Sequence, residues 1–341
     1  MKKLLTFCLL VQSLLSIAQQ RPHYTQYVLN NFILNPALAG IENYVDLKVS
    51  HRHQWVGLDG APVTTYATIH GPWRKSTDDI ETATTVRAAG GDNPRGRSFV
   101  QDYTAPANHS GVGFTILNDR TGPLNRFSAT AAYAYHMGIS ARTSLAMGVG
   151  VGLQNMTLNT NKLNFGTANP VDPAVGGSNY LNKLRPDVNI GLWLYSADYF
   201  IGASAQNIVP AKISYADDTV KLERGKLVPH IFITAGYKLF LSDDITFLPS
   251  LQARYISPTP ISFDVNAKFQ YQDIIWAGGS FRINDGFAAM VGFNASSTFN
   301  VGYSYDFITS RLNTVSRGTH EFTLGFLIGN RYGDWCPRNV F

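Results

Sequence analysis

The side chains most able to do chemistry in this sequence are histidines, and their spacing does not build an active site. His51 and His53 are two residues apart, so on a strand they would share a face and could begin a metal site. No third ligand is evident near them in the sequence, which favours a polar pair at a membrane interface. The dipeptide His320-Glu321 lacks the second histidine of a zincin motif. We therefore expect neither a metal nor a cofactor.

Two further segments resemble known catalytic or cofactor-binding motifs but lack the neighbouring residues or structure that those motifs require. Gly148-x-Gly150-x-Gly152 is followed by no helical pattern, so it is not a dinucleotide-binding loop. Gly202-Ala203-Ser204-Ala205 lacks the second glycine of a nucleophile elbow. An outer-membrane hydrolase needs a serine beside a histidine, and no spacing singles out a serine beside His136, His230 or His320. We expect the protein not to be an enzyme.

Residues 1–18 have the features of an export signal. Two lysines precede the apolar run 4–15, and the segment ends in the small-x-small pattern Ser16-Ile17-Ala18. Cys8 lies inside the apolar run and would be removed with it, so the mature chain is predicted to begin near Gln19. We expect the protein to be exported through this cleaved signal.

The mature composition excludes several classes of partner and site. Without Lys2 and Lys3, 26 basic residues face 23 acidic ones, a net charge of +3 that gives no reason to expect nucleic acid. Cys336 is then the only cysteine, which excludes an intramolecular disulfide framework and CxxC metal sites. Its thiol could instead cross-link to a partner.

The dominant pattern after residue 18 is period-two alternation in segments of about ten residues separated by turn residues. Because the chain has no run of about eighteen apolar residues, only a β-barrel could carry it across a bilayer. The mean hydropathy of −0.07 agrees with this, since lipid-facing and lumen-facing residues alternate in a barrel. The sequence predicts an all-β transmembrane antiparallel barrel of the outer membrane with about fourteen strands. The predicted strands are 44–52, 62–72, 110–118, 126–137, 144–154, 186–196, 199–207, 229–240, 246–255, 261–271, 274–282, 287–295, 298–306 and 319–328.

The two faces of the predicted strands differ in chemistry. In 144–154, large apolar residues alternate with glycine and alanine, so the first face is expected in lipid and the second in the lumen. The strands around Arg254 and Asp264 are joined by the short turn 256–260, so this pair could lie diagonally across the hairpin inside the barrel. Aromatic residues gather near strand ends, as interfacial girdles do. A soluble β-sandwich would show the same patterns and stays open on pattern alone.

The lengths of the connections predict the topology. An even number of strands places both termini in the periplasm, where the turns 138–143, 197–198, 241–245, 272–273 and 296–297 are short. The long connections 155–185 and 208–228 are then extracellular. The stretch 73–109 falls on the periplasmic side although it is long, and its many Gly, Asp and Arg residues favour an insertion over missed strands.

The chain is predicted to divide into a signal peptide at 1–18, a plug segment at 19–43, a barrel at 44–328 and a tail at 329–341. The segment 19–43 contains several large apolar side chains that would not remain in water, so we expect it to fold into the periplasmic mouth or the lumen. Its residues singled out as a plug or partner segment are Tyr24, Tyr27, Asn35, Pro36, Ala37 and Gly40.

Short motifs in a consistent order resemble the PorP/SprF family of type IX secretion and gliding-associated outer-membrane proteins. Each is weak alone, but together they cover nearly the whole mature chain. They are QRPHYTQY at 20–27, NPALAG at 35–40, RHQW at 52–55, PVT at 62–64, ND at 118–119, GP at 122–123, PDVNIG at 186–191, the strand 229–238, LPS at 248–250, GGSFR at 278–282, YSYD at 303–306, GTHE at 318–321 and Cys336-Pro337-Arg338.

The resemblance implies a fourteen-stranded barrel that works with the type IX machinery of Bacteroidota. It would act beside the periplasmic ring and lipoprotein components, or would anchor a secreted adhesin carrying a C-terminal sorting domain, with outer-membrane lipids around it. Two departures are the long segment 73–109 and the three residues after Cys336-Pro337-Arg338. A passive or substrate-selective porin is the alternative, and it would need an open lumen lined by charged ladders.

Overall fold

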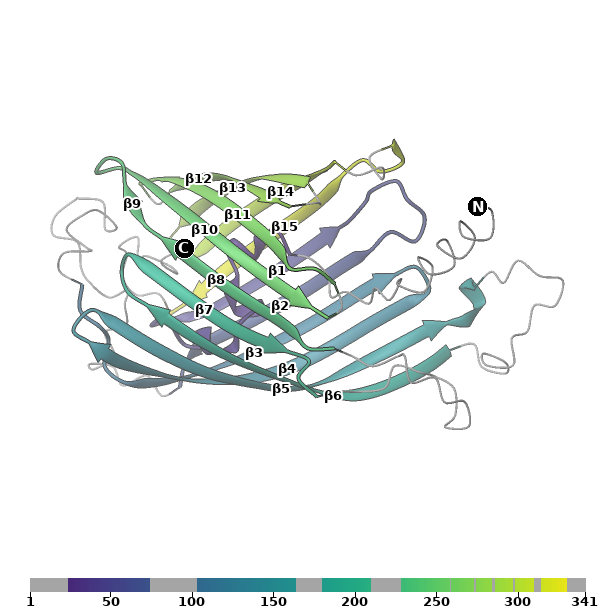
Figure 1. The fold of residues 1–341 in the computed structure, drawn as a ribbon, viewed down its shortest axis with the longest axis horizontal. Helices are drawn as coiled ribbons and strands as arrows, with labels where there is room; N and C mark the ends of the chain where they lie inside the picture. Colours follow the sequence, from purple (N-terminus) through teal and green to yellow (C-terminus); the bar gives the residue numbers. More distant parts are fainter. Residues whose placement is uncertain are drawn as a thin grey trace, which may run out of the picture.

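The structure is a computed structural model that describes residues 24–73, 103–163, 180–209 and 228–329, apart from 258, 273, 284–285, 297 and 310–313. Within these ranges the chain forms one antiparallel β-barrel, with short 3-10 helices in the segment that precedes it (Figure 1). The predicted signal peptide, most of 73–109, and Cys336, Pro337 and Arg338 in the predicted tail lie outside the described residues.

The elements follow one another along the chain with few helical residues. The 3-10 helices are η1 Gln26–Val28, η2 Asn31–Ile33, η3 Pro36–Leu38 and η4 Thr160–Lys162. The strands are β1 Val45–His53, β2 Val63–Pro72, β3 His109–Thr121, β4 Leu124–Ser140, β5 Thr143–Asn159, β6 Tyr180–Tyr195, β7 Tyr199–Gln206, β8 His230–Tyr237, β9 Leu239–Phe240, β10 Ile245–Ile256, β11 Ser262–Tyr271, β12 Ile275–Arg282, β13 Gly286–Ser296, β14 Phe299–Ile308 and β15 Thr319–Ile328.

The barrel is closed by its first and last strands. β1 pairs antiparallel with β2 along one edge and with β15 along the other, where Val45 lies opposite Ile328. β8 and β9 both pair with β10, so the short β9 continues β8 beyond Lys238. The predicted fourteen-stranded antiparallel barrel is confirmed. The predicted strand 229–240 is interrupted at Lys238, whose amide donates to the Asp198 carbonyl at 2.7 Å.

The two faces of the wall separate apolar from polar side chains. On β5, Val149 and Val151 are 41% and 59% exposed on the outer face, while Ala146 and Gln154 are almost fully buried on the inner face. The same alternation along the other strands surrounds the barrel with an apolar band of the kind that faces lipid. Among the described residues, no helix is long and apolar enough to cross a membrane.

Strands β3 to β6 extend further than the alternation predicts. β5 continues to Asn159 and β6 begins at Tyr180, so the connection between them is 160–179 rather than the predicted 155–185. The outward positions of these extensions include Asn155 and Thr157, which still pair in the ladder with β6. Polar residues such as these interrupt the apolar alternation of the outer face, so the sequence signal ends before the strands do.

The strand ends define two ends of the barrel. The short-turn end contains Val45, Ile328 and the connections 141–142, 196–198, 241–244 and 272–274. The opposite long-loop end contains the turn 54–62 and the connections 160–179, 207–229 and 309–318. The connection 73–108 begins and ends at the short-turn end, because Pro72 lies opposite Gly111 across β2 and β3.

Residues 24–44 lie inside the barrel before β1. They comprise the described part of the predicted plug segment 19–43 and the residue after it, and are called the plug segment from here on. Every one of them is buried except Leu29, which is half-buried. In Figure 1 this purple start of the chain lies between the walls of the barrel. The segment leads from the level of Arg52 and Asp306, near the long-loop end, to Tyr44 at the short-turn end.

Candidate functional site

The candidate site is the contact between the plug segment and the inner face of the barrel, which begins at Thr25. Thr25 Oγ1 donates to Asp306 at 2.8 Å and accepts from Arg52 and Arg282 at 2.9 and 2.7 Å. Its amide donates to Glu321 at 2.8 Å. One threonine thus contacts four charged side chains from β1, β12, β14 and β15.

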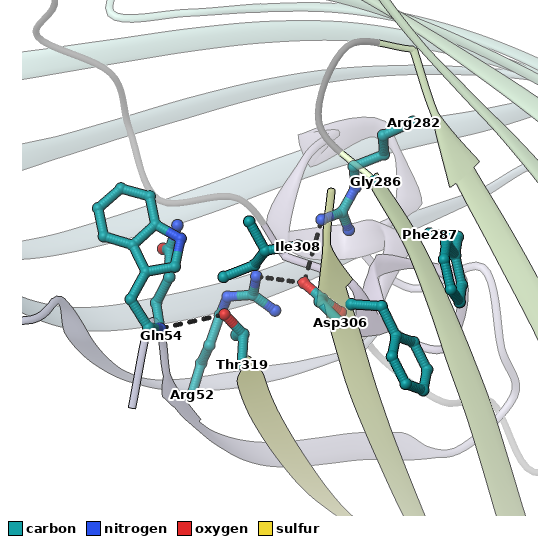
Figure 2. A pocket seen from close by; sticks show the side chains of 10 residues that line it. Arg52, Gln54, Arg282, Gly286, Phe287, Asp306, Ile308 and Thr319 are labelled. Carbon is teal, nitrogen blue, oxygen red and sulfur yellow. Dashed lines mark hydrogen bonds and ion pairs between the residues drawn. The ribbon is translucent and has the colours of Figure 1, made fainter. Parts of the chain in front are cut away.

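These four side chains form a buried network of alternating charge, which we call the Thr25 anchor. Arg52 donates to Asp306 at 2.6 Å and to Glu321 at 2.9 Å, and Arg282 donates to Asp306 at 3.1 Å. Figure 2 shows both guanidinium groups directed at Asp306. Because an unpaired buried charge is costly, each of these four side chains is stabilised by the opposite charges around it. Thr25 adds hydrogen bonds to all four.

Tyr27 and the hairpin of β10 and β11 lie beside this anchor. The Asn266 amide donates to the Tyr27 hydroxyl, and Asp264 accepts from Arg282 Nε at 3.3 Å. The register places Asp264 opposite Gln252, and Arg254 opposite Ser262, so Arg254 and Asp264 are diagonal neighbours on the lumen side. Asp264 also pairs with Arg282, which contacts Thr25.

The middle of the plug segment is held mostly through its backbone. The Leu34 carbonyl accepts from Ser204 Oγ at 2.7 Å and from Gln206 Nε2 at 2.9 Å. Asn35 Nδ2 donates to the Leu192 carbonyl at 2.9 Å, and Asn35 Oδ1 accepts from the amide of Ala37, which caps η3. These bonds satisfy polar groups that could not reach water inside the lumen.

Glycines on the barrel wall let the chain of η3 approach closely. A Cβ at Gly148 would lie 2.4 Å from the Ala37 nitrogen, and one at Gly191 would lie 1.8 Å from Asn35 Oδ1. At Gly111 it would lie 1.9 Å from the Ala39 carbonyl oxygen. Only glycine allows this contact of the wall with Asn35 to Gly40. The small lumen face of β5 is thus in contact with Pro36 and Ala37.

Three histidines surround the chain where it leaves η3. His136 Nε2 lies 2.8 Å from the Ala39 carbonyl, and His109 Nε2 lies 3.1 Å from the Gly40 carbonyl. The Gly40 amide donates to His70 Nδ1 at 3.4 Å. The rings of His109 and His136 stack with centroids 4.5 Å apart. These imidazoles hold backbone groups, and in the part of the chain that the structure describes no cluster of His, Cys, Asp or Glu could hold a metal ion.

A small cavity lies beside the plug segment. A cavity of about 40 Å³ lies between Phe32, Pro36 and Asn189, with room for a few water molecules. Beyond the strands, Tyr103 packs on the same apolar cluster as Leu38 and Ile41. Burial raises the pKa of the Tyr103 hydroxyl, so this group stays protonated.

The plug residues predicted from the sequence lie together in the lumen, whereas Cys336, Pro337 and Arg338 lie outside the described residues. The sequence interpretation missed the Thr25 anchor and the histidines at Ala39 and Gly40. A usable signal was present, because period-two alternation puts Arg52, Asp306 and Glu321 on lumen faces. What the pattern lacked was the barrel closure that brings β1 beside β15.

Comparison with known proteins decides the family of this plugged barrel. Residues 16–326 match the family described as type IX secretion system membrane protein PorP/SprF. The chain belongs to the PorP/SprF family. Its closed barrel and this membership of a secretion-system membrane family support an outer-membrane location. A search of curated proteins gives no significant match.

Several solved structures are similar to this PorP/SprF protein at low sequence identity. Omp33 of Acinetobacter baumannii is 7% identical with a TM-score of 0.46, over 85% of this chain and 100% of that one. The CymD monoaromatic hydrocarbon channel is 11% identical with a TM-score of 0.46, over 91% and 94%. A FadL homologue of Pseudomonas aeruginosa is 10% identical with a TM-score of 0.44, over 85% and 91%.

Proposed function

We propose that this protein is a non-enzymatic docking barrel of the type IX secretion and gliding machinery. It would hold a secreted adhesin with a C-terminal sorting domain, or the periplasmic ring, at the outer membrane. The observation that carries the proposal is the plug segment, which occupies the lumen and is bonded to the wall from Thr25 to Gly40. A barrel filled by its own chain is suited to binding partners through its loops and ends.

The plug segment also argues against the porin alternative. A porin needs a water-filled lumen with exposed charged ladders. Here the inner charges Arg52, Asp306 and Glu321 are buried and engaged with each other and with Thr25. They therefore hold the start of the plug segment against the wall, which supports a plugged lumen over an open one.

The proposed orientation places the short-turn end in the periplasm and the long-loop end outside the cell, after cleavage of the signal near Gln19. Cysteine labelling of intact cells tests it in a Cys336→Ser background. Asp59→Cys, in the exposed turn 54–62, should react with an impermeant maleimide, whereas Arg142→Cys, in the turn 141–142, should react only after lysis. The reverse pattern would invert the proposed orientation.

The docking role is tested by deleting the gene and by purifying the tagged full-length protein from mildly cross-linked outer membranes. We expect the deletion to abolish surface display of a sorting-domain adhesin, or secretion as a whole. Purification should recover that adhesin or the ring and lipoprotein components. Unchanged secretion and display, with none of these proteins recovered, would contradict the proposal. A processing test by N-terminal sequencing of the mature protein completes the experiment.

A further inference from the structure

The outer face of the barrel changes from apolar to polar near the long-loop end of β1 and its neighbours. Val49, Leu324 and Ile116 are exposed on β1, β15 and β3, within the apolar band. After Val49, the next two outward residues along β1 are His51 and His53. On β1 the apolar band thus ends two outward residues before the turn 54–62, at the level where lipid headgroups would meet the hydrocarbon region.

Strand register brings two outward histidines from distant parts of the chain together at this level. His53 on β1 lies directly opposite His320 on β15, and His51 lies two residues below His53. On β14, Tyr305 lies opposite His320, with ring centroids 5.0 Å apart. The third imidazole, that of His320, could not be found from the spacing of His51 and His53, because only barrel closure brings β15 beside β1.

Two of the three imidazoles are oriented by hydroxyl groups bonded to Nδ1. His320 Nδ1 is bonded to the Tyr303 hydroxyl at 2.8 Å, and His51 Nδ1 is bonded to the Thr65 hydroxyl at 2.9 Å. When these hydroxyls donate, Nε2 of each ring carries the proton and can donate to an anion. In that tautomer both rings present a hydrogen-bond donor at the edge of the apolar band.

A cation completes this surface. Arg120 on β3 is exposed and lies opposite Val63, which in turn lies opposite His53, so two strand spacings of about 10 Å separate Arg120 from His53. An arginine side chain can reach across most of that distance. No carboxylate stands among the outward residues paired in the rows of His51 and His53 on β2, β3, β14 and β15. Besides Arg120 and His320, those residues are Asn118, Val63, Thr65, Phe322, Tyr303 and Tyr305.

We propose that Arg120, His51, His53 and His320 bind the phosphate group of a membrane glycolipid in the leaflet at the long-loop end. Arginine and imidazole N–H groups are strong phosphate donors, and the apolar residues directly below would contact the acyl chains. In the orientation proposed above, this leaflet is the outer one. The chemistry itself depends only on the barrel spanning a membrane, not on its docking role.

Native mass spectrometry of the purified full-length barrel tests the lipid site with two probes, bisphosphorylated lipid A and the same lipid without phosphates. We expect the wild type to retain the phosphorylated lipid about tenfold better, as strong charge-assisted hydrogen bonds imply. The variant Arg120→Ala with His53→Ala and His320→Ala should lose this preference. Arg142→Ala, which removes an exposed arginine at the other end, should keep it.

Three results would overturn the proposal. They are equal retention of the two lipids by the wild type, equal loss of preference in Arg142→Ala, and displacement of the lipid by millimolar inorganic phosphate, which would indicate a site for the free anion. If the triple variant fails to fold, Arg120→Gln with His53→Gln keeps both positions polar while removing the guanidinium and imidazole groups, and should still lower the preference severalfold. Because the assay uses purified protein, failure of the docking proposal would not change its outcome.

Discussion

The two halves of the plug segment are held in the lumen by different physical means. From Tyr24 to Leu34, Thr25 and the backbone bond to charged and amide side chains of the wall. From Asn35 to Gly40, the chain lies against glycines of the wall, and His70, His109 and His136 contact it through its backbone atoms. The first half is recognised through charge and the second through shape, so they should respond differently to substitution.

The largest effect should follow loss of Arg52 from the Thr25 anchor. Arg52→Ala leaves Asp306 and Glu321 buried without their shared partner, and breaking such a pair costs about 3–5 kcal/mol. Urea unfolding of the barrel in lipid vesicles measures this change. Arg142→Ala is the matched control, since Arg142 is exposed in a turn and should change the unfolding free energy little. Equal midpoints for the two variants would show that the anchor is not stabilising.

The next effect tests recognition by shape. Gly111→Ala places a methyl group against the Ala39 carbonyl and should cost about 2–3 kcal/mol, because backbone atoms of both partners must move. Gly279→Ala is the control, since the nearest atom to its Cβ is 3.7 Å away on the outer face. The same urea experiment compares them. If both variants are as stable as the wild type, the close approach of the wall glycines to residues 35–40 does not stabilise this half of the plug segment.

A smaller effect is expected at the boundary between the halves. Asn35→Ala removes the bond to the Leu192 carbonyl and the cap on Ala37, and should cost about 1–2 kcal/mol. Faster hydrogen exchange of the Ala37 amide would accompany the loss. Exchange unchanged from that of the wild type would mean that Asn35 does not order η3.

The smallest effect is expected at Ser204. Ser204→Ala removes one of two donors to the Leu34 carbonyl, while Gln206 still bonds to the same oxygen. The cost should be about 1 kcal/mol or less. A loss as large as that of Arg52→Ala would show that the charged Thr25 anchor is not the main contact that holds the first half.

The sequence predicted the barrel well because alternation is a local property of each strand. Strand positions, the even count and the short turns all follow from residues close together in the chain. The strand extensions of β5 and β6 were missed, since Asn155 and Thr157 face outward without an apolar signal. The predicted residue Asp264 lies beside the anchor, where it pairs with Arg282 on the next strand.

The remaining site residues depend on contacts between distant parts of the chain. Thr25 meets Asp306 across 281 positions, and His136 meets Ala39 across 97. No spacing rule links such residues before the closure of the barrel and the path of the plug segment are known. For the same reason, the sequence alone could not predict that His320 lies opposite His53 on the outer face.

The most direct test of the central claim is the conductance of the purified wild-type protein in planar lipid bilayers. The lumen occupied by residues 24–44 predicts no large steady current. A variant in which residues 24–40 are replaced by a Gly/Ser linker of equal length should conduct steadily and show that the barrel inserts. A large steady current through the wild type, equal to that of the linker variant, would contradict a plugged docking barrel and favour a porin.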